Sequence, residues 1–225
     1  MPTTHAVRPT PHSAHASKDT ATRILDTAEG LFVEFGFDAT SLRAITQQAH
    51  VNLAAVNYHF GSKDALFQAV LVRRLEPLNQ QCIAELEALE ASGAPFTVEA
   101  ILMTFARPSL TLSKDPDRGG AMFVRLLSRA FVENHRLIRD TLPLQYSEFL
   151  VRYRNAFARV LPQLSEEERV WRLHLAFGLM FHAFAGNDML KLFMKSDIVS
   201  ARDPDTVVKH MIPFVAAGMV TPPLG

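Results

Sequence analysis

The residues best suited to chemistry lie in one short segment, 40–63, where polar side chains recur at close spacing. An asparagine such as Asn57 can pair with adenine through two hydrogen bonds. Hydroxyl, imidazole and ammonium groups suit phosphate oxygens, which position a protein on DNA without specifying its sequence. The polar candidates for DNA contact in this segment are Thr40, Ser41, Asn52, Asn57, Tyr58, His59 and Lys63. These residue types predict a surface that binds DNA.

Small and apolar side chains share this segment and predict a helix that lies close to the bases. Leu53, Ala54 and Ala55 are expected to project outward, where their methyl groups can touch thymine methyls. Val56 and Phe60 are four residues apart, a spacing that places both on the inner face of a helix. The segment is therefore expected to present a small outward face for reading DNA.

The overall charge gives no support to DNA binding, but the charge distribution does. The chain carries 23 Lys and Arg against 23 Asp and Glu, so its formal net charge is zero. Residues 1–75 hold seven basic and six acidic residues, and five of those acids lie between Asp19 and Asp38. From Ser41 to Lys63 there are two basic residues and no acid. A small positive face is therefore expected despite the neutral total.

A first helix is expected to support this segment. Apolar residues at helical spacing between Ile24 and Phe35 predict a stripe that faces a core. Gly36 follows and can end the helix, because glycine readily adopts the left-handed conformation found there. Thr40 or Ser41 can then cap a short second helix.

The second and third helices are expected to form a helix-turn-helix. A turn at 49–51 separates them, Asn52 can cap the third helix, and Gly61 ends it. Two short helices joined by a three-residue turn are typical of this motif. Ser62 can cap a long fourth helix, which is expected to run over 63–91.

The remaining sequence also follows the helical period, and no segment is typical of a strand. Pro77 is expected to bend the fourth helix. Further helices are expected near 97–112, 118–131, 144–161, 166–185 and 204–219. The predicted fold class is all-α, with a disordered tail at 1–17, a three-helix helix-turn-helix domain at 18–66, and a C-terminal helical domain at 67–225 joined through the fourth helix.

Residues 24–66 resemble the DNA-binding domain of TetR-family transcription regulators. The resemblance rests on Phe32, Phe35, Gly36, Phe37, Thr40, Ser41, Ile45, Ala49, Val51, the run from Val56 to Lys63, and Leu66. It implies a homodimer whose two recognition helices read an inverted repeat in double-stranded DNA, usually as a repressor.

Two positions depart from the family pattern. His50 stands where the turn usually has glycine, so a left-handed histidine is expected. Asn57 stands where tyrosine is frequent, which concerns the operator sequence rather than the binding mode. The string 51–63 is similar to that of PsrA-type regulators, which respond to fatty acids.

In TetR-like proteins the C-terminal helices bind an effector, and this sequence offers suitable residues. A mostly apolar cavity with one or two polar anchors suits an amphiphilic ligand, and methionine adapts to irregular pockets. The candidate effector-binding residues are Met103, Arg107, Phe123, Leu127, Phe149, Arg152, Tyr153, His174, Phe177 and Phe181. The resemblance implies a fatty acid or acyl thioester, with its head on an arginine. The alternative interpretation is that these aromatic side chains form an ordinary core.

Two late segments are candidates for a dimer interface. Residues 170–185 are apolar nearly all round, and residues 207–215 provide a second apolar helix. Two such helices per subunit, facing their copies, would make a four-helix interface. A core helix in a monomer is the alternative interpretation.

Other classes of protein receive less support. The sequence contains no Gly-rich phosphate loop, His-Glu-x-x-His, Gly-x-Ser-x-Gly or cysteine cluster, so no enzyme, metal site or cofactor is predicted. The lone cysteine, Cys82, favours a reducing cytoplasm. The longest apolar stretch, 173–186, is shorter than the roughly 20 residues of a membrane span. A helical adaptor that binds proteins rather than specific DNA remains the alternative function.

Overall fold

The computed structural model describes residues 11–115, 120–132, 147–184 and 203–222, and the secondary-structure elements within those ranges are helices. The predicted all-α class is confirmed. The chain divides into two compact units between Val72 and Arg73, within the fourth helix and six residues after the predicted boundary at residue 66. One continuous helix is therefore shared by both units.

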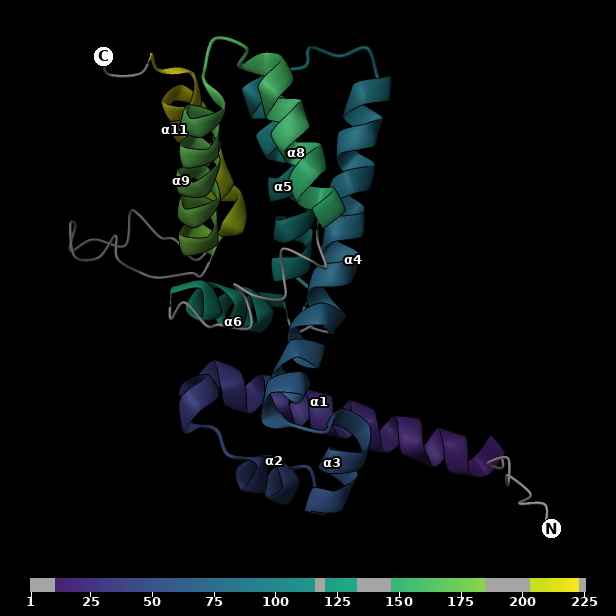
Figure 1. The fold of residues 1–225 in the computed structure, drawn as a ribbon. Coiled ribbons are helices and arrows are strands. Elements are labelled where there is room, and N and C mark those ends of the chain that lie inside the picture. The colour runs from purple at the N-terminus through teal and green to yellow at the C-terminus, as the bar shows by residue number, and fades with distance from the viewer. Residues whose placement is uncertain (1–10, 116–119, 133–146, 185–202, 223–225) are drawn as a thin grey trace, which may run out of the picture. The chain divides into compact units, whose positions relative to one another are not determined.

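The first unit contains α1 (Pro11–Ala39), α2 (Leu42–Gln48), α3 (Leu53–Phe60) and the beginning of α4 (Lys63–Ala91), as Figure 1 shows. Within it, α1 packs against α2 and α3, and α2 packs against α3. Residues 11–17 belong to α1, so this helix begins inside the segment predicted as a disordered tail, whereas residues 1–10 lie outside the described residues. Proline suits the first turn of a helix, and alanine has the highest helix propensity, which together favour an early start.

The core of the first unit forms where the predicted stripe of α1 meets the other helices. Phe32 is fully buried, and its ring meets that of Phe67 edge-on at 5.0 Å between centroids. Ile45 from α2 and Val56 from α3 are also fully buried. Phe35 belongs to the predicted stripe but is 48% exposed, so the buried stripe of α1 is narrower than expected.

The second unit contains the rest of α4 with α5 (Val98–Ser113), α6 (Gly120–Val132), α8 (Ser147–Val160), α9 (Glu166–Phe184) and α11 (Pro204–Val220). The central helix is α5, which packs against α6, α8, α9 and α11 and is buried along most of its length. In Figure 1, α9 and α11 lie side by side, in agreement with their packing contacts. These helices match the predicted ones closely, although positions 118–119, 144–146 and 185 lie outside the described residues.

The first residue of α6 must be glycine because the end of α5 approaches it closely. A Cβ atom at Gly120 would lie 2.6–2.7 Å from the backbone oxygens of Leu112, Ser113 and Asp115. The Gly120 N–H donates to the Asp115 carbonyl at 2.9 Å, which draws the backbone segments together. The close approach therefore leaves no space for a side chain.

Candidate nucleic-acid interface and sensor core

Two side-chain caps set the starts of the helices in the helix-turn-helix. Ser41 Oγ accepts a hydrogen bond from the Ala44 N–H at 3.1 Å, at the beginning of α2. Asn52 Oδ1 accepts from the Ala55 N–H at 2.8 Å, at the beginning of α3. Each bond satisfies an N–H group that has no partner inside its helix. Both capping residues remain exposed at the surface of the unit.

The turn between α2 and α3 has the backbone conformation that its sequence predicts. His50 has φ of 53°, so the left-handed histidine is confirmed. The Val51 N–H reaches the Thr46 carbonyl at 3.0 Å and closes the turn. At the other end of α3, Gly61 has φ of 77° and its N–H donates to the Asn57 carbonyl. One residue with positive φ thus lies in the turn before α3, and another lies directly after the helix.

The outward face of α3 has the small and polar character that DNA reading requires. Leu53, Ala54 and Asn57 are exposed, whereas Ala55 is half-buried. Tyr58 is 82% exposed, and the half-buried His59 ring packs edge-on against it at 5.0 Å between centroids. This face can bring an amide, a phenol and aliphatic groups to the edges and phosphates of a duplex.

Two residues predicted to contact phosphates have partners within the first unit instead. Thr40 is buried, and its hydroxyl lies 3.1 Å and 2.7 Å from the carbonyl oxygens of Leu31 and Gly36. Gly36 has φ of 82° and interrupts the helical backbone of α1, so Thr40 secures the break that glycine was predicted to make. A buried hydroxyl engaged with backbone carbonyls is poorly placed for DNA, which corrects the expectation for Thr40.

Lys63 is the second residue of this kind. Its Nζ lies 4.3 Å from the centroid of the Phe37 ring and donates to the Asp38 carbonyl at 3.3 Å. The side chain is half-buried and connects the end of α1 to the beginning of α4. We therefore correct the expectation that Lys63 is simply a free phosphate ligand.

Arg43 is a basic residue of the helix-turn-helix that we did not predict to contact DNA. It lies on α2 and is exposed, as are Gln47 and Gln48 on the same helix. Arginine is a frequent ligand of phosphates and of guanine edges. The sequence could have indicated this role for Arg43, because Arg43 is one of only two basic residues between Ser41 and Lys63.

In the second unit, several candidate effector residues gather in one aromatic cluster, here defined as Phe105, Phe149, Tyr153, Phe177 and Phe181. The rings of Phe149 and Tyr153 are 4.5 Å apart, and the Phe105 ring meets that of Phe177 at 5.0 Å. Phe177 and Phe181 are half-buried, whereas the other three side chains are buried. The cluster therefore reaches from the core to the surface of the unit.

The remaining apolar candidates belong to the packed interior or its margin. Phe123 and Leu127 of α6 are buried, with at most 2% of their surface exposed. Met103 of α5 is half-buried. Their burial agrees with the alternative interpretation that part of the candidate set is ordinary core.

A neutral polar pair lies against the buried side of the aromatic cluster. The Tyr153 hydroxyl is 2.9 Å from Thr104 Oγ1 and 3.3 Å from the Cys82 carbonyl oxygen. Burial raises the pKa of Tyr153 well above its ordinary value and raises the pKa of the Cys82 thiol to about 12. Both groups therefore stay protonated near neutral pH, so this part of the core offers hydroxyl groups without charge.

The charged candidates lie on the exterior instead, where acidic residues of α4 neutralise them. Arg107 Nη1 lies 2.8 Å from Glu85 Oε2, and Arg152 forms an ion pair with Glu87 and a longer one of 3.9 Å with Glu90. His174 is also exposed, with its ring 6.2 Å from that of Trp171. These three residues do not join the aromatic cluster, which corrects the expectation that Arg107 or Arg152 lies in the same apolar site.

A cavity of about 210 Å³ lies elsewhere in the second unit and contains none of the predicted effector residues. It is lined by Arg73, Arg74, Pro77, Leu78, Gln81 and Leu112. Ligand pockets commonly measure about 300–1,000 Å³, so this cavity is small for an acyl chain. A long acyl chain could enter this cavity only if the apolar side chains that line it, Pro77, Leu78 and Leu112, moved apart.

Large apolar side chains are exposed on both α9 and α11, and we call this set of residues the α9/α11 face. On α9, Val170, Trp171 and Leu175 are each more than half exposed. On α11, Phe214 is 69% exposed and Val220 is 50% exposed. Large apolar side chains left at the surface mark a site of protein association where they form one patch.

Neither a metal site nor a membrane-spanning helix is found among the described residues. No group of three or more His, Cys, Asp or Glu among them could hold a metal ion. None of the described helices is long and apolar enough to cross a membrane.

Comparison with known proteins assigns the family. The sequence model described as "Bacterial regulatory proteins, tetR family" matches residues 24–70, and the one described as "Tetracyclin repressor-like, C-terminal domain" matches residues 103–218. The second match alone covers about half of the chain. This chain belongs to the TetR family of DNA-binding transcriptional regulators.

Individual relatives agree with this assignment. The regulator UidR of Escherichia coli K12 is 37% identical over 60 residues, which is 27% of this chain and 31% of UidR. RutR of the same strain is 31% identical over 118 residues, or 52% of each chain. The chain thus spans about a third to a half of the length of these curated relatives.

A solved structure shows the same fold over nearly the whole chain. NalD, the secondary repressor of the MexAB-OprM efflux pump in Pseudomonas aeruginosa, is 22% identical with a TM-score of 0.57. The match covers 91% of this chain and 98% of NalD. At this identity, the likeness establishes the shared fold alone.

Proposed function

We propose that this protein is a homodimeric, ligand-released repressor that binds an inverted repeat in double-stranded DNA. The observation that carries the proposal is the outward face of α3, where Leu53, Ala54, Asn57 and Tyr58 are exposed on a helix held by the Asn52 cap. Two copies of such a short helix, related by a two-fold axis, read two half-sites about one DNA turn apart.

The α9/α11 face supports the dimer in this proposal. TetR-family regulators act as dimers. In this chain, Trp171, Leu175 and Phe214 would be covered if two copies packed their α9 and α11 helices together. A two-fold interface brings the same surface of each subunit together, so one self-complementary apolar face suffices.

The proposed effector is an amphiphilic small molecule such as a fatty acid or an acyl thioester. The aromatic cluster offers apolar walls that reach the surface through Phe177 and Phe181. Tyr153 and Thr104 add hydroxyl groups, whereas the candidate arginines lie in exterior ion pairs. The Thr104 hydroxyl now donates to the Ile101 carbonyl and the Tyr153 hydroxyl to the Cys82 carbonyl, so a ligand would have to exchange one of these bonds. Because no cation among the described residues lies beside these uncharged groups to neutralise a carboxylate, we favour the acyl thioester.

The proposed mechanism uses α4, since this one helix belongs to both units. An effector that prefers one arrangement of the sensor helices changes the angle of α4 and so the separation of the two recognition helices. Operator binding then weakens, because both helices no longer fit major grooves one turn apart. This function places the protein in the cytoplasm, where bacterial DNA lies.

A gel-shift experiment with DNA from upstream of the protein's own gene tests the proposal. Asn57→Ala is expected to cost about 1–3 kcal/mol of operator binding and to relax base preference at one position per half-site. Asn155→Ala, at an exposed position of α8, is the matched control and should bind like the wild type. Absence of specific, salt-dependent DNA binding by the wild type would overturn the regulator and favour the adaptor.

The effector is tested in the same assay with palmitoyl-CoA and palmitate. Release by palmitoyl-CoA at lower concentration than palmitate supports the acyl thioester. If palmitate releases the protein from the operator and palmitoyl-CoA does not, the acyl thioester is rejected and the effector is a free fatty acid. Operator affinity unchanged by both would reject a fatty acyl effector while leaving DNA binding untouched.

A further inference from the structure

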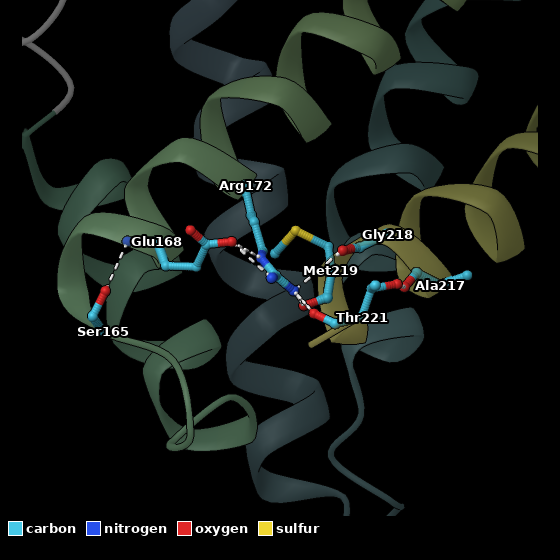
Figure 2. Close-up of polar contacts among 7 residues, drawn as sticks. All are labelled: Ser165, Glu168, Arg172, Ala217, Gly218, Met219 and Thr221. Carbon is cyan, nitrogen blue, oxygen red and sulfur yellow. Dashed lines mark hydrogen bonds and ion pairs between the residues drawn. The ribbon is translucent and has the colours of Figure 1, made fainter. Parts of the chain in front are cut away.

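Arg172 makes a dense set of polar contacts between α9 and the end of α11. Its Nε and Nη2 donate to Glu168 Oε1 at 2.9 and 2.7 Å. Its Nη1 reaches the carbonyl oxygens of Gly218, Met219 and Thr221 at 3.3, 2.8 and 2.5 Å (Figure 2). The side chain is only 9% exposed.

These contacts supply hydrogen-bond donors to the carbonyl groups at the end of α11. The last carbonyl groups of an α-helix have no partner inside it, and the helix dipole favours a cation there. The guanidinium of Arg172 supplies both donors and charge to α11, which ends at Val220. Glu168, one turn earlier on α9, orients the guanidinium from its other side, as Figure 2 shows. Its own N–H donates to Ser165 Oγ at the beginning of α9.

The contacts also fix how far α11 lies along α9. The buried apolar residues of the two helices, such as Met180 and Val215, impose little direction, because apolar packing is non-directional. The guanidinium fork has fixed geometry. Successive residues of a helix are about 1.5 Å apart along its axis, so a slip of one residue would strain or break these hydrogen bonds.

Residues adjacent to this fork form the α9/α11 face. Trp171 directly precedes Arg172 and Leu175 follows one turn later, and both are exposed. Val220, also exposed, lies between the Met219 and Thr221 carbonyls that Arg172 binds. The exposed apolar residues Trp171 and Val220 are therefore direct chain neighbours of the residues that the Arg172 contacts join.

We propose that Arg172 is a positioning residue for dimerisation, which sets the register of α9 and α11 so that their exposed apolar side chains form one surface that a second copy can match. The proposal rests on the homodimer proposed above. It assigns to Arg172 an effect on subunit affinity that is separable from folding of the subunit.

Sedimentation velocity over a range of protein concentrations tests this role, with circular dichroism as the measure of folding. Arg172→Met retains much of the aliphatic volume but removes the donors, and should raise the dimer Kd by about tenfold or more. Arg172→Lys keeps the charge without the fork and should give an intermediate Kd with wild-type helicity. Arg159→Met is the matched control, because it removes an arginine that pairs with Glu90 on the exterior between α8 and α4.

The outcomes separate this inference from the homodimer itself. A raised dimer Kd in folded Arg172→Met and Arg172→Lys, with Arg159→Met unchanged, supports the inference. Wild-type Kd values in both Arg172 variants, or a lowered melting temperature as their only change, would overturn it. If Arg172→Met does not fold, Arg172→Lys decides by the same criterion. A wild-type chain that stays monomeric at micromolar concentration would overturn the homodimer, and the inference with it.

Discussion

Lys63 lies over the ring of Phe37, with its Nζ 4.3 Å from the ring centroid. The same ammonium donates to the carbonyl oxygen of Asp38. The positive charge that the sequence places at the beginning of α4 therefore contributes to holding the end of α1. We therefore expect the DNA affinity and the stability of the first unit to depend on different basic residues.

We expect Lys63→Met to lower the free energy of unfolding by about 0.5–1 kcal/mol, the usual size of a cation–π contact at a partly exposed site. Urea titration followed by circular dichroism measures this change. Lys114→Met removes an exposed ion pair with Asp205 and should have little effect on stability. The salt dependence of operator binding should be the same in Lys63→Met as in wild type. If the slope of log affinity against log salt concentration fell by about one in Lys63→Met, Lys63 would be a phosphate contact after all.

Arg43→Ala is expected to weaken binding to all DNA sequences to a similar extent. Arg43 is exposed on α2 in a segment without acidic residues, so it suits a phosphate contact. Each phosphate contact contributes about 0.9 to the slope of log affinity against log salt concentration. Fluorescence anisotropy at several salt concentrations measures the slope. The control Arg154→Ala changes an exposed arginine of α8, and an equal loss of slope there would refute the assignment.

Gly120→Ala is expected to destabilise the second unit by about 1–3 kcal/mol, as overpacking typically does. The new methyl group would lie under 3 Å from three backbone oxygens at the end of α5, which side-chain rotation cannot relieve. Thermal unfolding measures the effect. Gly178→Ala is the control, because a Cβ atom at Gly178 meets nothing within 4 Å and alanine favours the helix. Equal stability of Gly120→Ala and wild type would contradict the close approach.

The buried Cys82 thiol predicts a loss of stability at alkaline pH. Burial raises its pKa from 9.0 to about 12 in the folded chain. Above pH 9 the unfolded chain releases this proton while the folded chain retains it, so folding loses up to about 1.4 kcal/mol per pH unit from this group. The contribution is fully present below pH 9 and disappears as pH rises toward 12.

Urea titrations of wild type and Cys82→Ala at pH 8, 9 and 10 isolate this effect, because tyrosines titrate near pH 10 in both proteins and their contribution cancels in the comparison. The variant should lose stability less steeply with pH than the wild type, whatever its stability at pH 8. Parallel pH profiles would show that the thiol ionises equally easily in both states.

Local features of the fold were predictable from sequence because local chemistry decides them. Ser41 and Asn52 cap their helices as expected, and His50 adopts the left-handed conformation. Neighbouring residues determine these features, so short segments contain the necessary information. The apolar period similarly located α5 and α9 to within a residue or two at their described ends.

Partners distant in sequence were not predictable in the same way. Residue types alone suggested that Lys63 is available for DNA and that Arg152 can hold a ligand, but the fold brings Phe37 to the first and Glu87 to the second. Arg172 was not singled out at all, because the carbonyl groups it binds lie 46 to 49 positions further along the chain. Such assignments depend on which helices pack together.

The burial of Cys82 has a practical consequence for site-specific labelling. It is the single cysteine of the sequence, and its buried, protonated thiol reacts slowly with maleimides, which require an accessible thiolate. Any cysteine introduced at an exposed position, such as Asn155→Cys, is then the rapidly modified thiol in the folded chain. A fluorophore or spin label can therefore be attached at a chosen point without first replacing a core residue.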